Sequence, residues 1–186
     1  MDKKKILLVL FILVAIVQIS FSASMIINRE ITLKSGKQFK FRTAPVDPYD
    51  AFRGRYVALD LEEEDRKVPV SEDEDYTLSQ TVYAIIKEDE EGFARIKTIQ
   101  TERPDHDNYI KTWIYMLSKN TVSLRIPFNR FYMDEFEAPR AEEAYRKSSR
   151  RGDSETYITV RVKSGSGVIE GLYIDNKHIR EYIHER

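Results

Sequence analysis

Cysteine is absent from the 186 residues of this chain. Its absence excludes disulfide bonds, thiol nucleophiles, zinc sites built on cysteine and an anchor attached to a lipid-modified cysteine. The net charge is only −1, so no basic excess marks a nucleic-acid-binding protein. The sequence also lacks the phosphate-binding patterns GxxxxGK[ST] and GxGxxG and the nucleophile elbow GxSxG. No catalytic motif therefore stands out, and we expect no cofactor and no nucleic acid partner.

Hydrophobic residues are concentrated near the N-terminus. No charged residue occurs from Ile6 to Ile27, and 18 of these 22 residues are apolar. A helix of this length spans about 33 Å, which is enough for the ~30 Å hydrocarbon core of a bilayer. Lysines precede the run but do not directly follow it, which favours a cytoplasmic N-terminus. We predict a cytoplasmic segment 1–5, a signal-anchor helix 6–27 in contact with membrane lipid, and a single extracytoplasmic domain 28–186.

The same segment has two other interpretations. In a cleaved signal peptide, residues 6–17 would form the apolar stretch and Ser22, Ala23 and Ser24 the cleavage region. Alternatively, the run could be a buried helix of a globular core. The retained anchor is favoured because it accounts for the full run to Ile27.

Charge is distributed unevenly over the predicted domain. Residues 60–91 contain 13 acidic and 3 basic residues, with acidic runs at 62–65, 72–75 and 88–91. Carboxylates suit calcium or magnesium, so a cation- or ligand-sensing domain is one possible function. None of these runs has the Asp-x-Asp-x-Asp-Gly spacing of a calcium-binding loop, and runs of this kind are typical of solvated turns.

Alternation of polar and apolar residues predicts mostly strands. Val57, Leu59 and Leu61 fall on one face of a predicted strand at 56–61. The predicted hairpins pair 31–33 with 38–41, 81–87 with 93–100, 109–117 with 121–126, and 155–163 with 168–174. A soluble helix is predicted at 140–147, and 178–184 forms either a strand or a short helix. We predict a β-rich α+β fold with antiparallel, hairpin-built sheets, one or two short helices and the N-terminal transmembrane helix.

One segment after the first predicted hairpin has more specific features. Two prolines restrict the chain, a glycine permits unusual backbone angles, and an aromatic strand follows. The segment resembles the GDYXXLXY family, and the matching residues are Pro45, Asp47, Pro48, Asp50, Gly54, Tyr56 and Leu59. Arg55 stands in place of the aspartate of the name motif, and Leu61 in place of its last tyrosine. A later segment with Arg130, Phe131, Tyr132 and Glu135 is similar to the family's Arg-Tyr-Phe-x-x-Glu segment.

The resemblance implies a bacterial protein held in the cytoplasmic membrane, with a periplasmic domain and no established activity. Members of the family are often encoded beside a multi-pass membrane protein, which implies a membrane-protein partner. We therefore predict a binding or accessory module for another envelope or multi-pass membrane protein. The proline-containing loop 45–56 and the aromatic segment 128–132 are its predicted contact surfaces.

An envelope hydrolase is the alternative from a different class. Such an enzyme would need acidic and imidazole side chains that converge in one site. Asp47, His106 and Glu135 are the residues that could form it.

Overall fold

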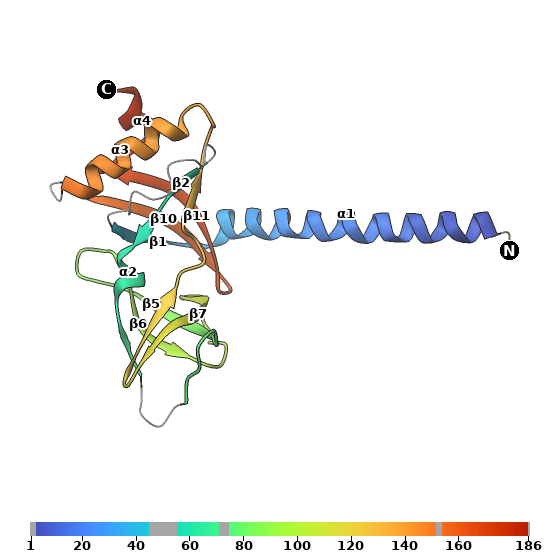
Figure 1. Cartoon of the computed structure of the whole chain (residues 1–186), viewed down its shortest axis with the longest axis horizontal. Coiled ribbons are helices and arrows are strands. Elements are labelled where there is room, and N and C mark those ends of the chain that lie inside the picture. Colours follow the sequence, from blue (N-terminus) through green and yellow to red (C-terminus); the bar gives the residue numbers. More distant parts are fainter. Residues whose placement is uncertain (1–2, 45–55, 71–74, 152–153, 186) are drawn as a thin grey trace.

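A single long helix projects from a β-rich domain (Figure 1). The computed structural model describes residues 3–44, 56–70, 75–151 and 154–185. Helix α1 (Lys3–Ser35) contains an 18-residue window with a mean hydropathy of 2.8, none of it buried against the rest of the chain. The helix is therefore long and apolar enough to cross a membrane.

The described residues of the domain form two five-stranded sheets and one separate pair of strands, and each of these strand pairs is antiparallel. The first sheet has the order β12-β11-β10-β1-β3 and the second has the order β4-β8-β7-β5-β6. The first comprises β1 (Lys37–Ala44), β3 (Asp60–Leu61), β10 (Thr156–Lys163), β11 (Ser166–Ile174) and β12 (Lys177–His178). The second comprises β4 (Val68–Pro69), β5 (Thr81–Glu88), β6 (Ala94–Gln100), β7 (Tyr109–Ser118) and β8 (Thr121–Arg125). The separate pair joins β2 (Tyr56–Ala58) to β9 (Arg130–Tyr132).

Three further helices complete the described part of the domain: α2 (Glu62–Asp65), α3 (Ala138–Arg151) and α4 (Ile179–His184). Helix α3 packs on β2, β10 and α4. Its buried Tyr145 donates a hydrogen bond of 3.0 Å to the carbonyl oxygen of Ala44, at the end of β1. The predicted β-rich fold with antiparallel hairpins, short helices and an N-terminal apolar helix is confirmed.

Three of the four predicted hairpins are present. Between β10 and β11 only Ser164 and Gly165 form the turn, and both have positive φ angles, 48° and 81°. This is the backbone that a two-residue turn needs in order to match the twist of its strands. The alternation at 56–61 is confirmed as well, since Val57, Leu59 and Leu61 are all buried.

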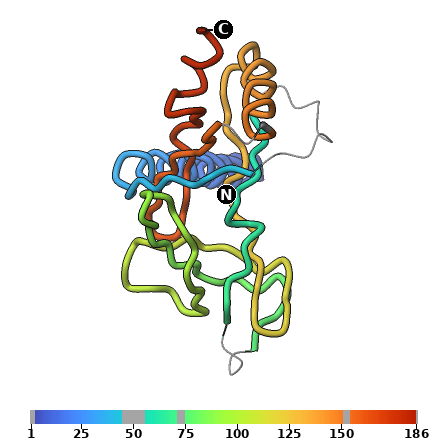
Figure 2. The backbone as a smooth tube through the Cα atoms, turned by 90° about the vertical axis from the view of Figure 1, so that its left-hand side faces the viewer, coloured from blue at the N-terminus to red at the C-terminus, as the bar shows by residue number. Residues whose placement is uncertain are grey.

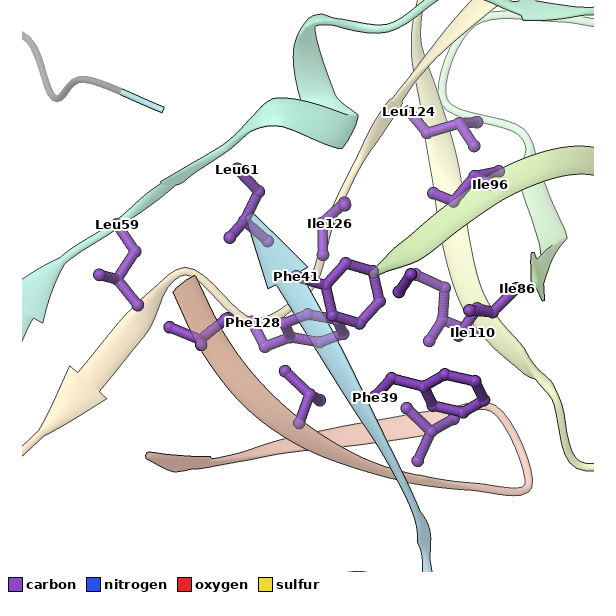
Figure 3. Close-up of a cluster of buried hydrophobic side chains, with 14 of the residues drawn as sticks. Phe39, Phe41, Leu59, Leu61, Ile86, Ile96, Ile110, Leu124, Ile126 and Phe128 are labelled. Carbon is purple, nitrogen blue, oxygen red and sulfur yellow. The ribbon is translucent and has the colours of Figure 1, made fainter. Parts of the chain in front are cut away.

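One continuous hydrophobic cluster joins the two five-stranded sheets (Figure 3). Phe39 and Phe41 of β1 enter it together with Phe128 and with Ile110 of β7. The ring of Phe41 meets the ring of Phe128 edge-on, with centroids 5.4 Å apart. Strand β1 thus belongs to one sheet by its hydrogen bonds and contributes to the packing of the other. Aromatic contacts of this kind add to the stabilisation that comes from burial alone.

The hairpin predicted between 31–33 and 38–41 is wrong. Helix α1 continues through 31–33 to Ser35, and the chain enters β1 after Gly36 alone. The buried Thr32 donates its side-chain hydroxyl to the carbonyl oxygen of Asn28, 2.9 Å away. The amide of Gly36 then donates to the carbonyl oxygen of Thr32 at 2.8 Å, which satisfies an acceptor of the last helical turn.

The end of α1 is docked on the first sheet. The helix contacts both β10 and β11. Lys163 donates to the hydroxyl oxygen of Ser35 at 2.6 Å, and Arg161 donates to the carbonyl oxygen of Gly36 at 3.3 Å. Viewed along the helix axis, α3 and α4 lie on one side of α1 and the second sheet lies on the other (Figure 2). The helix is therefore mounted near the middle of the domain, without an intervening linker.

Gly36 is needed for this close approach. A Cβ atom at this position would lie 2.5 Å from the carbonyl oxygen of Thr32 and 3.0 Å from that of Val162. Both neighbours are backbone atoms, so neither can move aside without displacing the helix or the strand.

We predict that Gly36→Ala destabilises the domain by roughly 1–3 kcal/mol, the usual cost of forcing an extra group into a packed site. Chemical denaturation of the detergent-solubilised chain, followed by circular dichroism, measures this change. Lys34→Ala is the control, because it removes only an exposed ion pair with Glu30 in the same helical turn, and it should change little. An alanine variant as stable as the wild type would contradict the close approach at Gly36.

Candidate functional site

The two segments that resemble the family motifs pair with each other. In the β2–β9 pair, Tyr56 lies opposite Tyr132, and Ala58 lies opposite Arg130. Side chains alternate along β9, so Phe131 is buried in the core while Arg130 and Tyr132 are exposed. The guanidinium of Arg130 lies 5.1 Å from the ring centroid of Tyr56, and the Tyr56 and Tyr132 rings are 5.5 Å apart.

A cavity of about 600 Å³ opens where α1 meets the domain. We call it the junction cavity. Its walls come from three parts of the chain: Met25, Asn28 and Arg29 of α1; residues 127–130 with Tyr132; and residues 166–169 of β11. The cavity therefore brings the end of the apolar helix together with the second motif segment, more than 90 residues away in the sequence.

Two arginines dominate the electrostatics of the junction cavity. Arg29 comes from α1 and Arg130 from β9. Within the described ranges neither guanidinium forms an ion pair, and Glu30, which follows Arg29, is paired with Lys34 at 3.0 Å. Asn28 and Asn129 add amide groups to the wall, and Phe128 adds apolar surface. The site combines positive charge with hydrogen-bond donors, which suits an anionic ligand.

The remaining predicted site residues divide into two groups. Leu59 and Phe131 belong to the hydrophobic core, and Leu59 also donates its amide to the carbonyl oxygen of Asn129 at 3.0 Å. Glu135 is exposed in the turn that leads from β9 to α3. The other predicted residues lie outside the described residues: Pro45, Asp47, Pro48, Asp50 and Gly54.

The described residues bring no hydrolase site together. His106 lies in the loop before β7, where its Nδ1 accepts a hydrogen bond from the Asn108 amide at 3.2 Å. No hydrogen bond or ion pair joins His106 to Glu135 in the described part of the chain. Asp47, the third residue of that hypothesis, is outside it. Nor do any three His, Asp or Glu side chains among the described residues form a group able to hold a metal ion.

The acidic run at 62–65 has a structural role that the sequence pattern did not indicate. Glu63 is only 1% exposed and accepts hydrogen bonds from the Ile96 amide and from Arg95, both at 2.9 Å. Arg95 also contacts Glu62 at 3.3 Å and Asp89 at 2.9 Å. The prediction of a solvated turn is wrong for this run, because its carboxylates connect α2 to β6, where Arg95 also contacts Asp89 of the turn between β5 and β6.

Glu64 makes the corresponding connection to β8. Its carboxylate accepts from the Ile126 amide at 2.7 Å and from Arg125 at 3.0 Å. Burial disfavours the charged form and raises the pKa of Glu64 above its ordinary value, although both of these hydrogen bonds act to lower it. Only the three-dimensional structure could reveal these roles, since Arg95 and Arg125 lie far from α2 in the sequence.

Strand β7 exposes an unusual number of large apolar side chains. The pairing of β7 with β8 is irregular between Ile114 and Met116, which interrupts the strict alternation of buried and exposed side chains. As a result the last part of β7 is largely exposed. We call its side chains the β7 apolar strip: Trp113, Tyr115, Met116 and Leu117, with exposed fractions of 37–51%.

Comparison with known proteins gives one match. A family model described as GDYXXLXY protein matches residues 18–172, from within α1 to β11. Searches of curated proteins and of solved structures return no match. The matched range includes the junction cavity, the β7 apolar strip and the acidic helix α2.

We predict that Glu63→Ala destabilises the domain by about 3–5 kcal/mol, because it leaves the largely buried Arg95 without its innermost partner. Thermal or chemical unfolding measures the loss. Glu143→Ala is the matched control, since Glu143 forms an exposed ion pair with Lys147 on α3 and should have little effect. Equal stability of the two variants would show that α2 is not anchored through Glu63.

We also predict a pH-dependent effect of Glu64→Gln. A carboxyl whose pKa is raised by folding favours the folded state below the unfolded-state pKa, and this contribution is lost as the pH rises through the folded-state pKa. The glutamine keeps an acceptor for the Ile126 amide but carries no charge to bury. The variant should therefore have a higher free energy of unfolding than the wild type, and this difference should be larger at about pH 7 than at about pH 3.5.

Urea denaturation at the two pH values tests this expectation, with the exposed Glu90→Gln as control. The raised pKa of Glu64 would be contradicted if Glu64→Gln increased the free energy of unfolding equally at both pH values, or only at the low pH.

Proposed function

We propose that this chain, which belongs to the GDYXXLXY family, is a single-pass protein of the bacterial cytoplasmic membrane that binds another membrane protein. Its N-terminus lies in the cytoplasm, and its β-rich domain lies on the outer, periplasmic side. The domain acts as a binding or accessory module rather than as an enzyme.

The observation that carries this proposal is the direct mounting of the domain on α1. Gly36 alone separates the helix from β1, and side chains of β10 hold the end of the helix. A domain mounted in this way stays at the membrane surface in one orientation, whereas a flexible linker would let it search a larger volume. Such a mount suits a partner that is itself fixed in the same membrane.

The proposed orientation is supported by the charges that flank α1. Lys3, Lys4 and Lys5 stand directly before the apolar run, in a segment of only five residues. Lysines in a short segment before a first apolar helix favour retention of that end in the cytoplasm, whereas a long domain after the helix is translocated largely regardless of its charge.

The β7 apolar strip is the proposed partner surface. Large apolar side chains that are exposed together on one strand can mark an interaction site. Aromatic residues and methionine are enriched in interfaces, and the strip contains both. We propose that it contacts an extracytoplasmic loop of a multi-pass membrane protein. Of the predicted contact segments 45–56 and 128–132, we retain as contact residues those with accessible side chains, such as Arg130 and Tyr132.

The absence of native cysteine permits a direct test of topology. We predict that a single cysteine at Lys97, which is exposed on β6, reacts with a membrane-impermeant maleimide added to intact spheroplasts. A single cysteine at Lys3 should react only after the membrane is permeabilised. The retained anchor also requires that both variants keep the mass of the full chain. Labelling of the Lys3 position alone, or loss of the N-terminal segment, would refute the proposed arrangement.

Site-specific photo-crosslinking tests the partner surface. We predict that a photoreactive amino acid at Trp113 or Leu117 gives one reproducible adduct with a multi-pass membrane protein in native membranes. The matched control is the same amino acid at Lys97, on an edge strand of the same sheet, and it should give no such adduct. Identical adduct patterns at all three positions, or none at the strip, would overturn the binding role of β7.

A further inference from the structure

The junction cavity lies at a defined depth relative to the membrane proposed above. The charge-free run ends at Ile27, and the next two residues, Asn28 and Arg29, line the cavity together with Met25. When α1 spans the bilayer, Met25 lies at the edge of the hydrocarbon and Arg29 at the level of the lipid headgroups. The cavity therefore opens where phospholipid phosphates are concentrated.

The chemistry of the cavity matches a phosphate ester. A guanidinium presents several N–H donors in a planar fork that fits phosphate oxygens. Arg29 and Arg130 bring two such groups into the cavity from different elements, and neither is neutralised by a carboxylate in the described part of the chain. A cation–π contact with the Tyr56 ring holds the guanidinium of Arg130 at this wall of the cavity.

The other walls suit the rest of a lipid headgroup. Asn28 and Asn129 can donate hydrogen bonds to ester or glycerol oxygens, while Met25 and Phe128 offer apolar surface. The volume of about 600 Å³ lies within the usual range of about 300–1,000 Å³ for small-molecule sites. The cavity can therefore hold a phosphate with its glycerol.

We infer that the junction cavity binds the phosphate of an anionic phospholipid, with Arg29 and Arg130 as its two phosphate-binding residues. The inference depends on the membrane insertion of α1 but not on a protein partner, so it can fail independently of the proposed β7 interface. A soluble phosphate ester has the same chemistry and is distinguished below.

Native mass spectrometry of the full chain in detergent measures this binding. We expect the wild type to retain phosphatidylglycerol at concentrations at which diacylglycerol of the same chain length, which lacks the phosphate, does not bind. The double variant R29Q/R130Q should bind phosphatidylglycerol at least roughly tenfold more weakly, because both charge-assisted contacts are lost. Arg150→Gln, which removes one exposed arginine from α3, is the control for a loss of surface charge away from the cavity and should bind like the wild type.

Two further measurements keep the inference falsifiable. Thermal unfolding must show that the double variant is folded; if it is not, the single variant R29Q replaces it, because Arg29 is exposed on α1 and lies outside the core. Soluble glycerol phosphate, added as a competitor, distinguishes the source of the phosphate. Displacement of the lipid by an equal concentration of glycerol phosphate would overturn the assignment to lipid. Unchanged phosphatidylglycerol binding by the arginine variant would overturn the site itself.

Discussion

The close approach between the last turn of α1 and β10 is the contact on which the rest of the arrangement depends. Gly36 has no side chain, so its backbone can lie close to the carbonyl oxygens of both Thr32 in the helix and Val162 in the strand. The helix then enters β1 at once, and β1 pairs with β10 along its length. This single junction fixes the orientation of the domain relative to the helix, closes one wall of the junction cavity, and places Phe39 and Phe41 in the shared core. A flexible linker at this position would remove all three consequences.

The domain itself is held together by apolar packing and by partly buried charges in different places. The cluster around Phe41 joins the two five-stranded sheets through ordinary hydrophobic burial. At one border of this cluster, α2 turns its carboxylates toward Arg95 and Arg125 and toward two backbone amides. Charges in such positions add little net stability, but removal of one partner is costly. The acidic character of α2 therefore serves the fold, and the junction cavity and the β7 apolar strip are the two surfaces to which we assign binding.

Much of the fold could be predicted because its signals are local. Alternation at Val57, Leu59 and Leu61 and the glycine-containing turn after β10 are both readable within a few residues. A short alternation of polar and apolar residues, as at 31–33, fits a strand as well as a helix. The choice of the helix depends on contact with β10, which the local sequence does not indicate. The site was harder to predict. The resemblance draws attention to Arg130 and Tyr132, but Arg29, which lines the same cavity, comes from a distant segment. The burial of Glu63 likewise depends on Arg95, 32 residues further along the chain.

The account is tested most directly by a distance measurement between the helix and the domain. Spin labels at single cysteines that replace the exposed residues Ile19 on α1 and Lys97 on β6 can be placed in the otherwise cysteine-free chain. In lipid nanodiscs, pulsed electron paramagnetic resonance should then give one narrow distance distribution, because the helix and the domain move together. A broad distribution, or several distances, would show that the domain swings freely on its anchor and would contradict the rigid junction.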